Sequence, residues 1–271
     1  MKVALVTGAS SGIGEATAVA LHEAGYTVYA AARRLQRMEG LAKRGIRVVR
    51  MDVTEDDSMV AGVEQVIAET GRIDLLVNNA GYGSYGAFED VPLAEGKYQF
   101  EVNVFGLARL VQLVVPHMRN AGSGRIVNVS SIGGRIYEPL GGWYHSTKFA
   151  VEGLSDSLRL ELKPFGIDVV VIQPGAIKTE WGGIAVENMK KTSGQGAYRD
   201  QVEALSAFFA QTERGSEPEV IADVIVKAAQ ARRPRTRYAA GFLARPVLFA
   251  RRVLPDRAFD ALFLGIMHRA A

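Results

Sequence analysis

The stretch Lys2-Val-Ala-Leu-Val-Thr7, which continues as Gly8-Ala-Ser-Ser-Gly12-Ile-Gly14, decides the fold. An apolar run of strand length enters a glycine-rich turn and then a helical pattern over 15–22, which indicates a buried parallel strand followed by a helix. Glycines let the backbone approach a ligand closely, and the first N–H groups of a helix attract anions. The stretch therefore predicts a phosphate-binding turn, although a tight structural turn that binds nothing gives the same pattern.

A second apolar run, Tyr26-Thr-Val-Tyr-Ala-Ala-Ala32, follows Gly25 and completes a strand-helix-strand unit. Further strands and helices alternate along the chain. This order predicts an α/β fold, a Rossmann-like doubly wound parallel sheet of about seven strands with helices on both faces and ligands at the carboxyl ends of the strands. The other expected strands are 46–51, 73–78, 125–130, 167–172 and 235–240, and the expected helices include 35–43, 56–70, 97–120 and 144–163.

Length and composition bound the class of protein. The chain has 271 residues, 48% of them apolar, and no linker or repeat interrupts it, so we expect a single domain over 1–271. The absence of cysteine excludes disulfides and thiolate catalysis, and the four histidines show no ligand-like spacing, so we expect no metal site. The N-terminus lacks a signal-peptide pattern, and no apolar run reaches the ~20 residues of a membrane span, so we expect a cytoplasmic location.

The net charge of +3 hides an asymmetry along the chain. Residues 232–271 contain nine arginines, no lysine and two aspartates, a local charge of +7 that leaves −4 for residues 1–231. A nucleic-acid-binding surface would spread basic and aromatic residues along a groove, and residues 1–231 show no such pattern. We therefore expect no nucleic-acid partner.

Two arginines, Arg33 and Arg34, follow the second expected strand. In dinucleotide-binding folds an acidic residue at this position binds the ribose of NAD, whereas an arginine accommodates the 2′-phosphate of NADP. The guanidinium fork matches phosphate oxygens with two hydrogen bonds. The pair thus predicts NADP(H) as the cofactor, with a solvated surface pair as the alternative.

Candidate catalytic residues follow in the second half. Ser131 precedes Tyr144-His-Ser-Thr-Lys148, and a tyrosine and a lysine four residues apart share one helix face. A cation about 4 Å from a tyrosine hydroxyl contributes about 4 kcal/mol, which lowers the pKa of tyrosine from about 10 toward neutrality. Such a tyrosine can exchange a proton, although Tyr-x-x-x-Lys on its own is common by chance.

Taken together, the motifs resemble the short-chain dehydrogenase/reductase family over nearly all of residues 1–240. Thr7–Gly14 is similar to the cofactor loop of that family, Asn78-Asn-Ala-Gly81 to its motif after the fourth strand, and Asn103 to its active-site asparagine. Ser131 lies thirteen residues before Tyr144, as is usual in the family, and Pro174-Gly175 with Thr179 resembles its motif after the sixth strand.

The resemblance implies a role for each matching residue. Tyr144 would be the catalytic acid/base, with Lys148 lowering its pKa and binding the nicotinamide ribose. Ser131 would polarise the substrate oxygen, and Asn103 would hold a water that relays protons to Lys148. The residues that the resemblance and the arginine pair assign to cofactor binding are Gly8, Ser10, Ser11, Gly12, Ile13, Gly14, Arg33, Arg34, Asp52, Val53, Asn79, Ala80, Gly81, Tyr144, Lys148, Pro174, Gly175, Ile177 and Thr179.

The substrate is left open by the family. Residues from about 176 to 215 would form a lid over it, and the lid's Trp181, Tyr198, Phe208 and Phe209 either line an apolar pocket or pack within the lid. After the lid, Ser216-Glu-Pro-Glu219 predicts a helix start with a capping box.

Two function classes fit these observations. The first is an NADP-dependent oxidoreductase that transfers a hydride between the nicotinamide and a carbonyl or alcohol small molecule, such as a steroid-like, retinoid-like or other lipophilic ketone or aldehyde. The second is a non-catalytic NADP-binding sensor or scaffold. Reduction of an enoyl thioester fits less well, because that branch of the family usually separates its tyrosine and lysine by more than four residues.

Two surfaces suggest partners. An apolar stripe of Leu107, Leu110, Val111 and Val114 lies on a helix that pairs across a two-fold axis in the family, so we expect a homodimer or homotetramer. The basic segment 241–271 predicts an amphipathic helix that begins at Pro255. Its apolar face either packs on the lid or a partner subunit, or lies on an anionic membrane surface without spanning the membrane. The residues of that face are Phe259, Leu262, Phe263, Ile266 and Met267.

Overall fold

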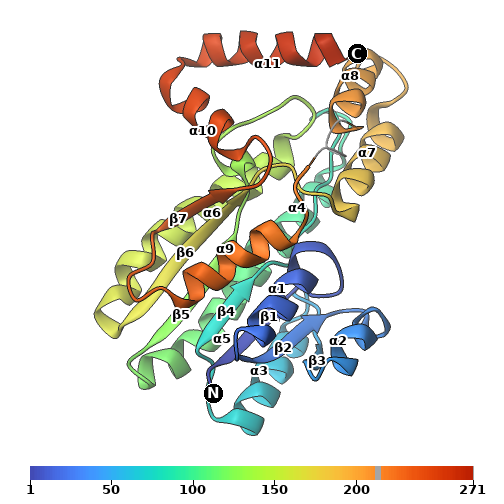
Figure 1. Cartoon of the computed structure of the whole chain (residues 1–271). Coiled ribbons are helices and arrows are strands. Elements are labelled where there is room, and N and C mark those ends of the chain that lie inside the picture. The colour runs from blue at the N-terminus through green and yellow to red at the C-terminus, as the bar shows by residue number, and fades with distance from the viewer. Residues whose placement is uncertain (211–214, 271) are drawn as a thin grey trace.

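The computed structural model describes residues 1–210 and 215–270, and their side chains except those of 268–270. In this part of the chain, seven parallel strands form one sheet in the order β3-β2-β1-β4-β5-β6-β7, which confirms the predicted fold class (Figure 1). The strands are β1 Val3–Thr7, β2 Thr27–Ala32, β3 Arg47–Arg50, β4 Leu75–Asn78, β5 Gly124–Val129, β6 Ile167–Pro174 and β7 Arg237–Ala240.

The strand order reverses at β1, and this reversal positions the site. β1 pairs with β2 on one side and with β4 on the other, so that Val6 lies opposite both Ala30 and Val77. The connections from β1 and β4 leave the sheet in opposite directions, which opens a crevice at the carboxyl ends of these two strands. Ligands bind at such a crevice in doubly wound sheets.

Helices cover both faces of the sheet, because successive side chains of each buried strand point to opposite faces. Val3 and Leu5 of β1 belong to the core under α3, α5 and α6, whereas Ala4 and Val6 belong to the core under α1 and α9. The helices are α1 Gly12–Glu23, α2 Glu39–Lys43, α3 Asp56–Thr70, α4 Leu93–Phe100, α5 Gly106–Asn120, α6 Gly142–Leu162, α7 Glu180–Ser193, α8 Arg199–Ala210, α9 Glu219–Gln230, α10 Ala244–Val253 and α11 Asp256–Ala270.

The helix expected over 97–120 is longer and less regular than predicted. It begins at Leu93 as α4, passes through a π-helical segment at Glu101–Phe105, and continues as α5. Asn103 lies in the π-helical segment. Such segments are rare and occur frequently at functional sites.

The apolar stripe expected to form an oligomer interface lies inside the chain's own core. Leu107 and Leu110 are 6% and 0% exposed, and Val111 and Val114 are buried with them against the sheet. The prediction that these four side chains face a partner subunit is therefore wrong. A helix face that covers a sheet and one that covers a partner show the same periodicity, so the sequence could not separate them.

The lid contains two helices, α7 and α8, and the chain returns from it differently than expected. Ser216 does not cap a helix. Its N–H donates to the carbonyl of Ala176 and its carbonyl accepts from the N–H of Lys178, so it forms a short bridge beside the start of the lid. Helix α9 starts at Glu219, with Pro218 at its N-cap and without a side-chain cap, so the capping-box prediction is wrong.

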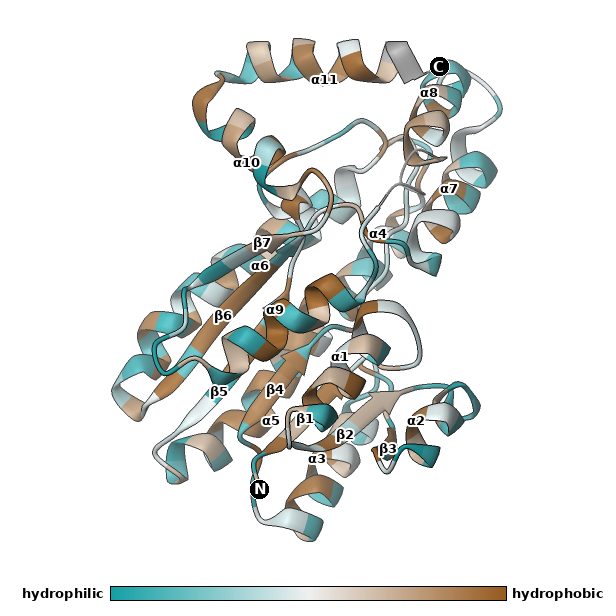
Figure 2. Cartoon of the chain, in the orientation of Figure 1, coloured by the Kyte–Doolittle hydropathy of each residue, from teal (hydrophilic) through white to brown (hydrophobic). Residues whose placement is uncertain are grey.

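Helices α10 and α11 follow β7, and α11 runs across the molecule from α10 to α8 (Figure 1). It begins directly after Pro255, as predicted. Phe259 and Met267 are buried, whereas Leu262 and Ile266 on the same helix are each 44% exposed, and hydropathy alternates along α11 (Figure 2). Within the described ranges, no helix combines the length and the apolar composition that crossing a bilayer requires.

Candidate active site

The glycine turn after β1 approaches β4 too closely for any side chain. A Cβ on Gly14 would lie 2.3 Å from the carbonyl oxygen of Gly8, and one on Gly8 would lie 2.8 Å from the Cα of Ala80. Gly8 and Gly12 also adopt φ values of 65° and 55°, which disfavour other residues. Helix α1 starts here without a side-chain cap on its first turn. The first N–H groups of α1 are thus left without a side-chain acceptor, and phosphate binding at this turn stays a prediction.

Asn79 holds this turn in place. Its side-chain amide donates to the carbonyls of Thr7 and Gly8 at 3.0 and 3.3 Å, and its backbone N–H donates to the Thr7 hydroxyl at 3.1 Å. The N–H of Ala80 donates to the same hydroxyl at 3.1 Å. The motif after β4 therefore positions the glycine turn, a role that the sequence did not indicate.

Arg33 and Arg34 follow the end of β2 and lie on the rim of the large cavity that the glycine turn also lines. The Arg33 side chain is 62% exposed, and its Nε lies 4.0 Å from the carboxylate of Asp52, a distance at which the ion pair is weak. Its guanidinium also donates to the hydroxyl of Tyr98 at 3.4 Å. A guanidinium held this weakly is free to donate hydrogen bonds to a phosphate group.

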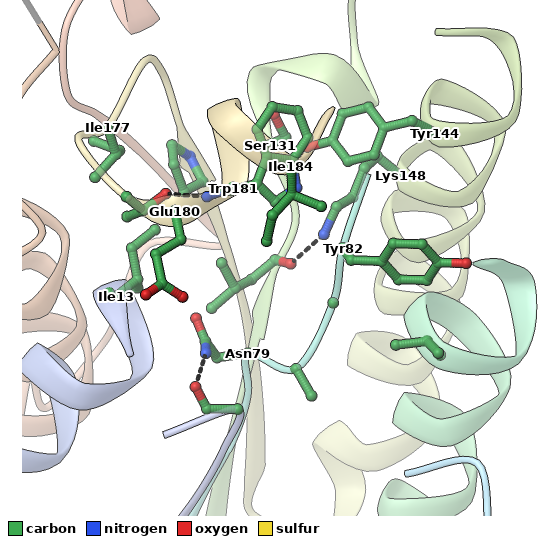
Figure 3. A pocket seen from close by; sticks show the side chains of 18 of the residues that line it. Ile13, Asn79, Tyr82, Ser131, Tyr144, Lys148, Ile177, Glu180, Trp181 and Ile184 are labelled. Carbon is green, nitrogen blue, oxygen red and sulfur yellow. Dashed lines mark hydrogen bonds between the residues drawn. The ribbon is translucent and has the colours of Figure 1, made fainter. Parts of the chain in front are cut away.

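One cavity of about 950 Å³ unites the predicted residues. It is lined by every residue expected to bind the cofactor except Gly14, which lies beneath the turn, and by Ser131, Tyr144 and Lys148. Figure 3 shows these last three converging at one end of the cavity, with Ile13 and Asn79 at the other. The glycine turn, the arginine rim and the size of the cavity together fit a dinucleotide with an exposed phosphate on its adenosine.

At the converging end, two of the three side chains come from α6 and the third from the segment after β5. Tyr144 and Lys148 lie one turn apart on α6, and both are buried. Ser131 follows β5, and its hydroxyl accepts from the N–H of Gly133 at 3.0 Å while it hydrogen-bonds Tyr144. The Lys148 ammonium donates to the carbonyl of Val129 at 3.0 Å.

The pKa of Tyr144 is raised, whereas the sequence predicted that Lys148 would lower it. Burial raises the pKa of Tyr144 above its ordinary value; the hydrogen bond with Ser131 lowers that pKa and the carboxylate of Glu138 raises it. The Lys148 ammonium lies 5.9 Å from the centre of the Tyr144 ring, so the predicted lowering of the tyrosine pKa by Lys148 is not seen in this structure. Burial lowers the pKa of Lys148 itself to about 8, and Glu152 opposes that effect.

Asn103 lies behind the cavity rather than in its wall. Its amide donates to the carbonyl of Tyr82 at 2.9 Å and to the hydroxyl of Thr147 at 3.0 Å, and its oxygen accepts from the N–H of Tyr82 at 3.0 Å. A Cβ on Gly81 would lie 3.1 Å from that oxygen and 3.8 Å from the Lys148 ammonium. Asn103 thus ties the loop after β4 to α6 close to Lys148.

The lid supplies an aromatic wall to the same end. The Trp181 ring lies 5.0 Å from that of Tyr144, and Trp181, Phe208 and Phe209 all line the cavity, which supports the pocket reading for these three. Tyr198 instead packs among the buried residues of the lid. Of the two alternatives for the lid aromatics, three side chains therefore line the pocket and Tyr198 packs within the lid.

Among the lining residues that the sequence did not predict, Tyr85 and Glu138 form a polar pair. Tyr85 is buried and its hydroxyl donates to Glu138 at 2.7 Å, and Glu138 comes from the segment between β5 and α6. Neither belongs to a motif with a spacing that predicts a site. His145 lines the cavity too, and both of its ring nitrogens lie within hydrogen-bond distance of backbone groups. The described residues contain no cluster of potential metal ligands. His268 lies outside the described side chains.

Comparison with known proteins identifies the family. The family model described as short chain dehydrogenase matches residues 2–190, so the chain belongs to the short-chain dehydrogenase/reductase family. Its members oxidise alcohols or reduce carbonyl groups, which makes the chain an oxidoreductase acting on CH–OH or C=O groups.

Two relatives carry names that state a reaction. The 3-ketodihydrosphingosine reductase of Bacteroides thetaiotaomicron is 39% identical, with 94% of each chain covered. The NADPH-dependent 3-dehydrocapnine reductase of Ornithobacterium rhinotracheale is 32% identical, covering 97% of this chain and 96% of its own.

Two solved structures share the fold. A short-chain dehydrogenase from Streptomyces avermitilis superposes with a TM-score of 0.81 at 35% identity, covering 98% of this chain and 95% of that one. A metagenomic short-chain oxidoreductase in complex with NADP has a TM-score of 0.69 at 28% identity, covering 88% and 95%. The NADP-bound neighbour agrees with the NADP(H) cofactor predicted from Arg33 and Arg34.

Proposed function

We propose that the chain is an NADPH-dependent reductase of a lipophilic, long-chain ketone. The observation that carries this proposal is that one cavity joins a glycine turn and an arginine rim to Ser131 and the buried Tyr144 and Lys148, under an aromatic lid. When bound, the nicotinamide supplies the hydride. The protein positions the ketone and supplies the proton.

The protein's own residues handle the ketone oxygen. The Ser131 hydroxyl already accepts from the N–H of Gly133, so its hydrogen is directed away toward Tyr144 and the cavity. A carbonyl oxygen placed between Ser131 and Tyr144 receives one hydrogen bond from each. Tyr144 then gives its proton to that oxygen, and the raised pKa of Tyr144 keeps the proton on the hydroxyl until the oxygen becomes basic.

The substrate class follows from the lid and the relatives. Trp181, Phe208 and Phe209 give the substrate end of the cavity apolar, aromatic walls. The names of the two relatives specify a 3-keto dihydrosphingosine and a 3-dehydro capnine, and they favour a long-chain ketone over the steroid-like or retinoid-like substrates that the sequence left open.

The test is NADPH oxidation with octadecan-3-one, a steroid ketone, retinal and an enoyl thioester. We expect turnover with octadecan-3-one above that with the other three. A protein that binds NADPH but reduces none of them would instead be the non-catalytic sensor or scaffold. The intact set of Ser131, Tyr144 and Lys148 counts against that alternative.

We also infer a homodimer or homotetramer, on a different surface from the buried stripe. Phe105 beside α5, and Phe149 and Leu160 on α6, are 54%, 46% and 66% exposed. They give the outer faces of these helices an apolar surface that a second copy can cover. Sedimentation at micromolar concentration tests this inference, and a monomer would contradict it.

The C-terminal helices support peripheral contact with an anionic membrane. Arg245, Phe249, Arg252 and Val253 fall at i, i+4, i+7 and i+8 on α10, and all four are exposed, Phe249 by 66%. Apolar burial combined with about 1 kcal/mol for each basic residue near the surface makes reversible binding favourable.

The acidic side chains of this region are paired within the protein. Asp256 forms an ion pair with Arg251 at 2.8 Å, and Asp260 accepts from Tyr137 at 2.8 Å. α11 in turn packs on the lid, with the Phe263 ring 5.8 Å from that of Phe208, which lines the cavity. A membrane at this surface would therefore present lipid-dissolved ketones beside the substrate end.

Vesicle flotation tests the contact. We expect binding to phosphatidylglycerol vesicles at low salt, little binding to phosphatidylcholine, and loss of binding in Phe249→Ser/Val253→Ser. Leu93→Ser, which changes an exposed side chain on α4, is the control. Absent binding at low salt, or binding unchanged by the double substitution, would leave only the packing role on the lid. The predicted cytoplasmic, membrane-peripheral location stays a prediction.

A further inference from the structure

A carboxylate stands in the substrate end of the cavity, where the proposed reaction does not use it. Glu138 lines the cavity between β5 and α6, and its side chain is only 10% exposed. Its surroundings include the buried aromatic rings of Tyr85 and Tyr144. Burying a charge among apolar groups is costly unless a partner compensates it.

Within the described part of the chain, Glu138 has a hydrogen bond from Tyr85 but no lysine or arginine beside it. Tyr85 donates to one carboxylate oxygen at 2.7 Å. Among the described residues, no lysine or arginine forms an ion pair with Glu138. The neighbouring cations are engaged elsewhere, Arg135 with Glu152 at 3.2 Å and Arg251 with Asp256.

The adjacent histidine does not donate a hydrogen bond to the carboxylate either. The Nε2 of His145 lies 3.8 Å from the Glu138 carboxylate, but it accepts the backbone N–H of Glu138 at 3.2 Å, so it carries no proton. The Nδ1 of the same ring lies 2.9 Å from the carbonyl of Gly133 and therefore bears the proton. The ring N–H of His145 is thus directed at Gly133 and not at the Glu138 carboxylate.

Glu138 also lies close to the place where the ketone reacts. Tyr85 connects the two, because its hydroxyl holds Glu138 while its ring lies 5.6 Å from that of Tyr144. A ketone whose oxygen contacts Tyr144 would therefore have its neighbouring atoms in the part of the cavity that Glu138 lines.

We propose that Glu138 is an ammonium-binding subsite, and that the substrate is a long-chain ketone with a protonated amine close to the carbonyl group. This inference rests on the proposed reductase function and names the substrate class of the same site. A charge-assisted hydrogen bond between the ammonium and the carboxylate compensates the buried charge and fixes the ketone over Tyr144. The bound ammonium also offsets the effect by which Glu138 raises the pKa of Tyr144.

The decisive variant is Glu138→Gln, which keeps an oxygen for the Tyr85 hydroxyl and removes only the charge. The probes are 2-aminooctadecan-3-one, its N-acetyl derivative and octadecan-3-one, each reduced with NADPH. We expect the unmodified protein to prefer the free amine in kcat/KM by about ten- to a hundredfold. The variant should lose that preference, mainly through KM. Glu187→Gln, an exposed glutamate on α7, is the matched control.

Two results would overturn the subsite. One is an unmodified protein that reduces all three probes equally well, and the other is a variant that loses activity equally on all three, which would give Glu138 a structural role through Tyr85. A protein that reduces no ketone would refute the proposed function, and the subsite is then tested without turnover. Calorimetric titration of the NADP⁺-bound protein with dodecylammonium and with dodecanol should still show tighter, Glu138-dependent binding of the ammonium, and equal affinities would refute it.

Discussion

The two ends of the cavity are built in different ways. The cofactor end is formed mainly by backbone. Gly8 and Gly14 leave no room for a side chain, and Asn79 holds their turn against the end of β4. At the substrate end, side chains from distant segments meet, among them Glu138 and Trp181. The first end is fixed by the sheet itself. Single substitutions at the second end need not disturb the sheet, so we expect the choice of substrate to be determined there.

The largest expected effect is that of Tyr144→Phe, which should remove most of the catalysis at the substrate end and leave NADPH binding at the cofactor end almost intact. The ring and its packing remain while the proton donor is lost, so NADPH should bind almost normally and kcat should fall about a hundredfold to ten-thousandfold. Turnover of octadecan-3-one and fluorescence titration with NADPH measure the two effects. Tyr137→Phe, which removes a hydroxyl bonded to Asp260 outside the cavity, is the control. A variant that kept more than about a tenth of kcat would show that Tyr144 is not the acid.

The cofactor end is tested by Arg33→Ala. Charge-assisted hydrogen bonds to a phosphate are worth about 1.5–3 kcal/mol, so the affinity for NADPH should fall about ten- to a hundredfold while that for NADH changes little. Titration of both cofactors into both proteins gives the four dissociation constants, with the exposed Arg44→Ala as control. Equal affinities for NADPH and NADH in the unmodified protein would refute the assignment of the arginine rim.

The smallest expected effect concerns stability: the buried, protonated Lys148 lowers the free energy of unfolding. Because burial lowers its pKa to about 8 in the folded protein, against 10.5 ordinarily, the protonated lysine costs stability below pH 8, and that cost disappears as the pH rises from about 8 to 10.5. Lys148→Met should therefore melt higher than the unmodified protein at pH 7, on the order of several °C, with a smaller difference at pH 10. Melting curves at both pH values, with the exposed Lys43→Met as control, measure this. An equal or lower melting temperature of Lys148→Met at pH 7 would contradict the assignment.

The same contrast explains what could be predicted from the sequence. The sheet, the glycine turn and the arginine rim were predictable because short stretches, such as Thr7–Gly14, contain the whole signal. Ser131, Tyr144 and Lys148 were found because a fixed spacing joins them.

Other features depend on how distant segments pack. Glu138 and Tyr85 meet only when the loop after β4 folds against the segment before α6, and no local pattern announces that contact. The stripe at Leu107 and Leu110 has the right periodicity for an interface, but the sheet covers it. Burial, which is the largest cause of the raised pKa of Tyr144, is likewise a property of the assembled core.

We propose above that NADPH bound in this cavity transfers a hydride to a long-chain ketone. NADPH deuterated at C4 of the nicotinamide on the transferred face, incubated with the protein and octadecan-3-one, tests it directly, because mass spectrometry of the product follows the label. We predict octadecan-3-ol with one deuterium at C3, formed by the unmodified protein and greatly reduced in Tyr144→Phe. A protein that binds the labelled NADPH yet yields no deuterated alcohol from this ketone or its 2-amino derivative would contradict the claim.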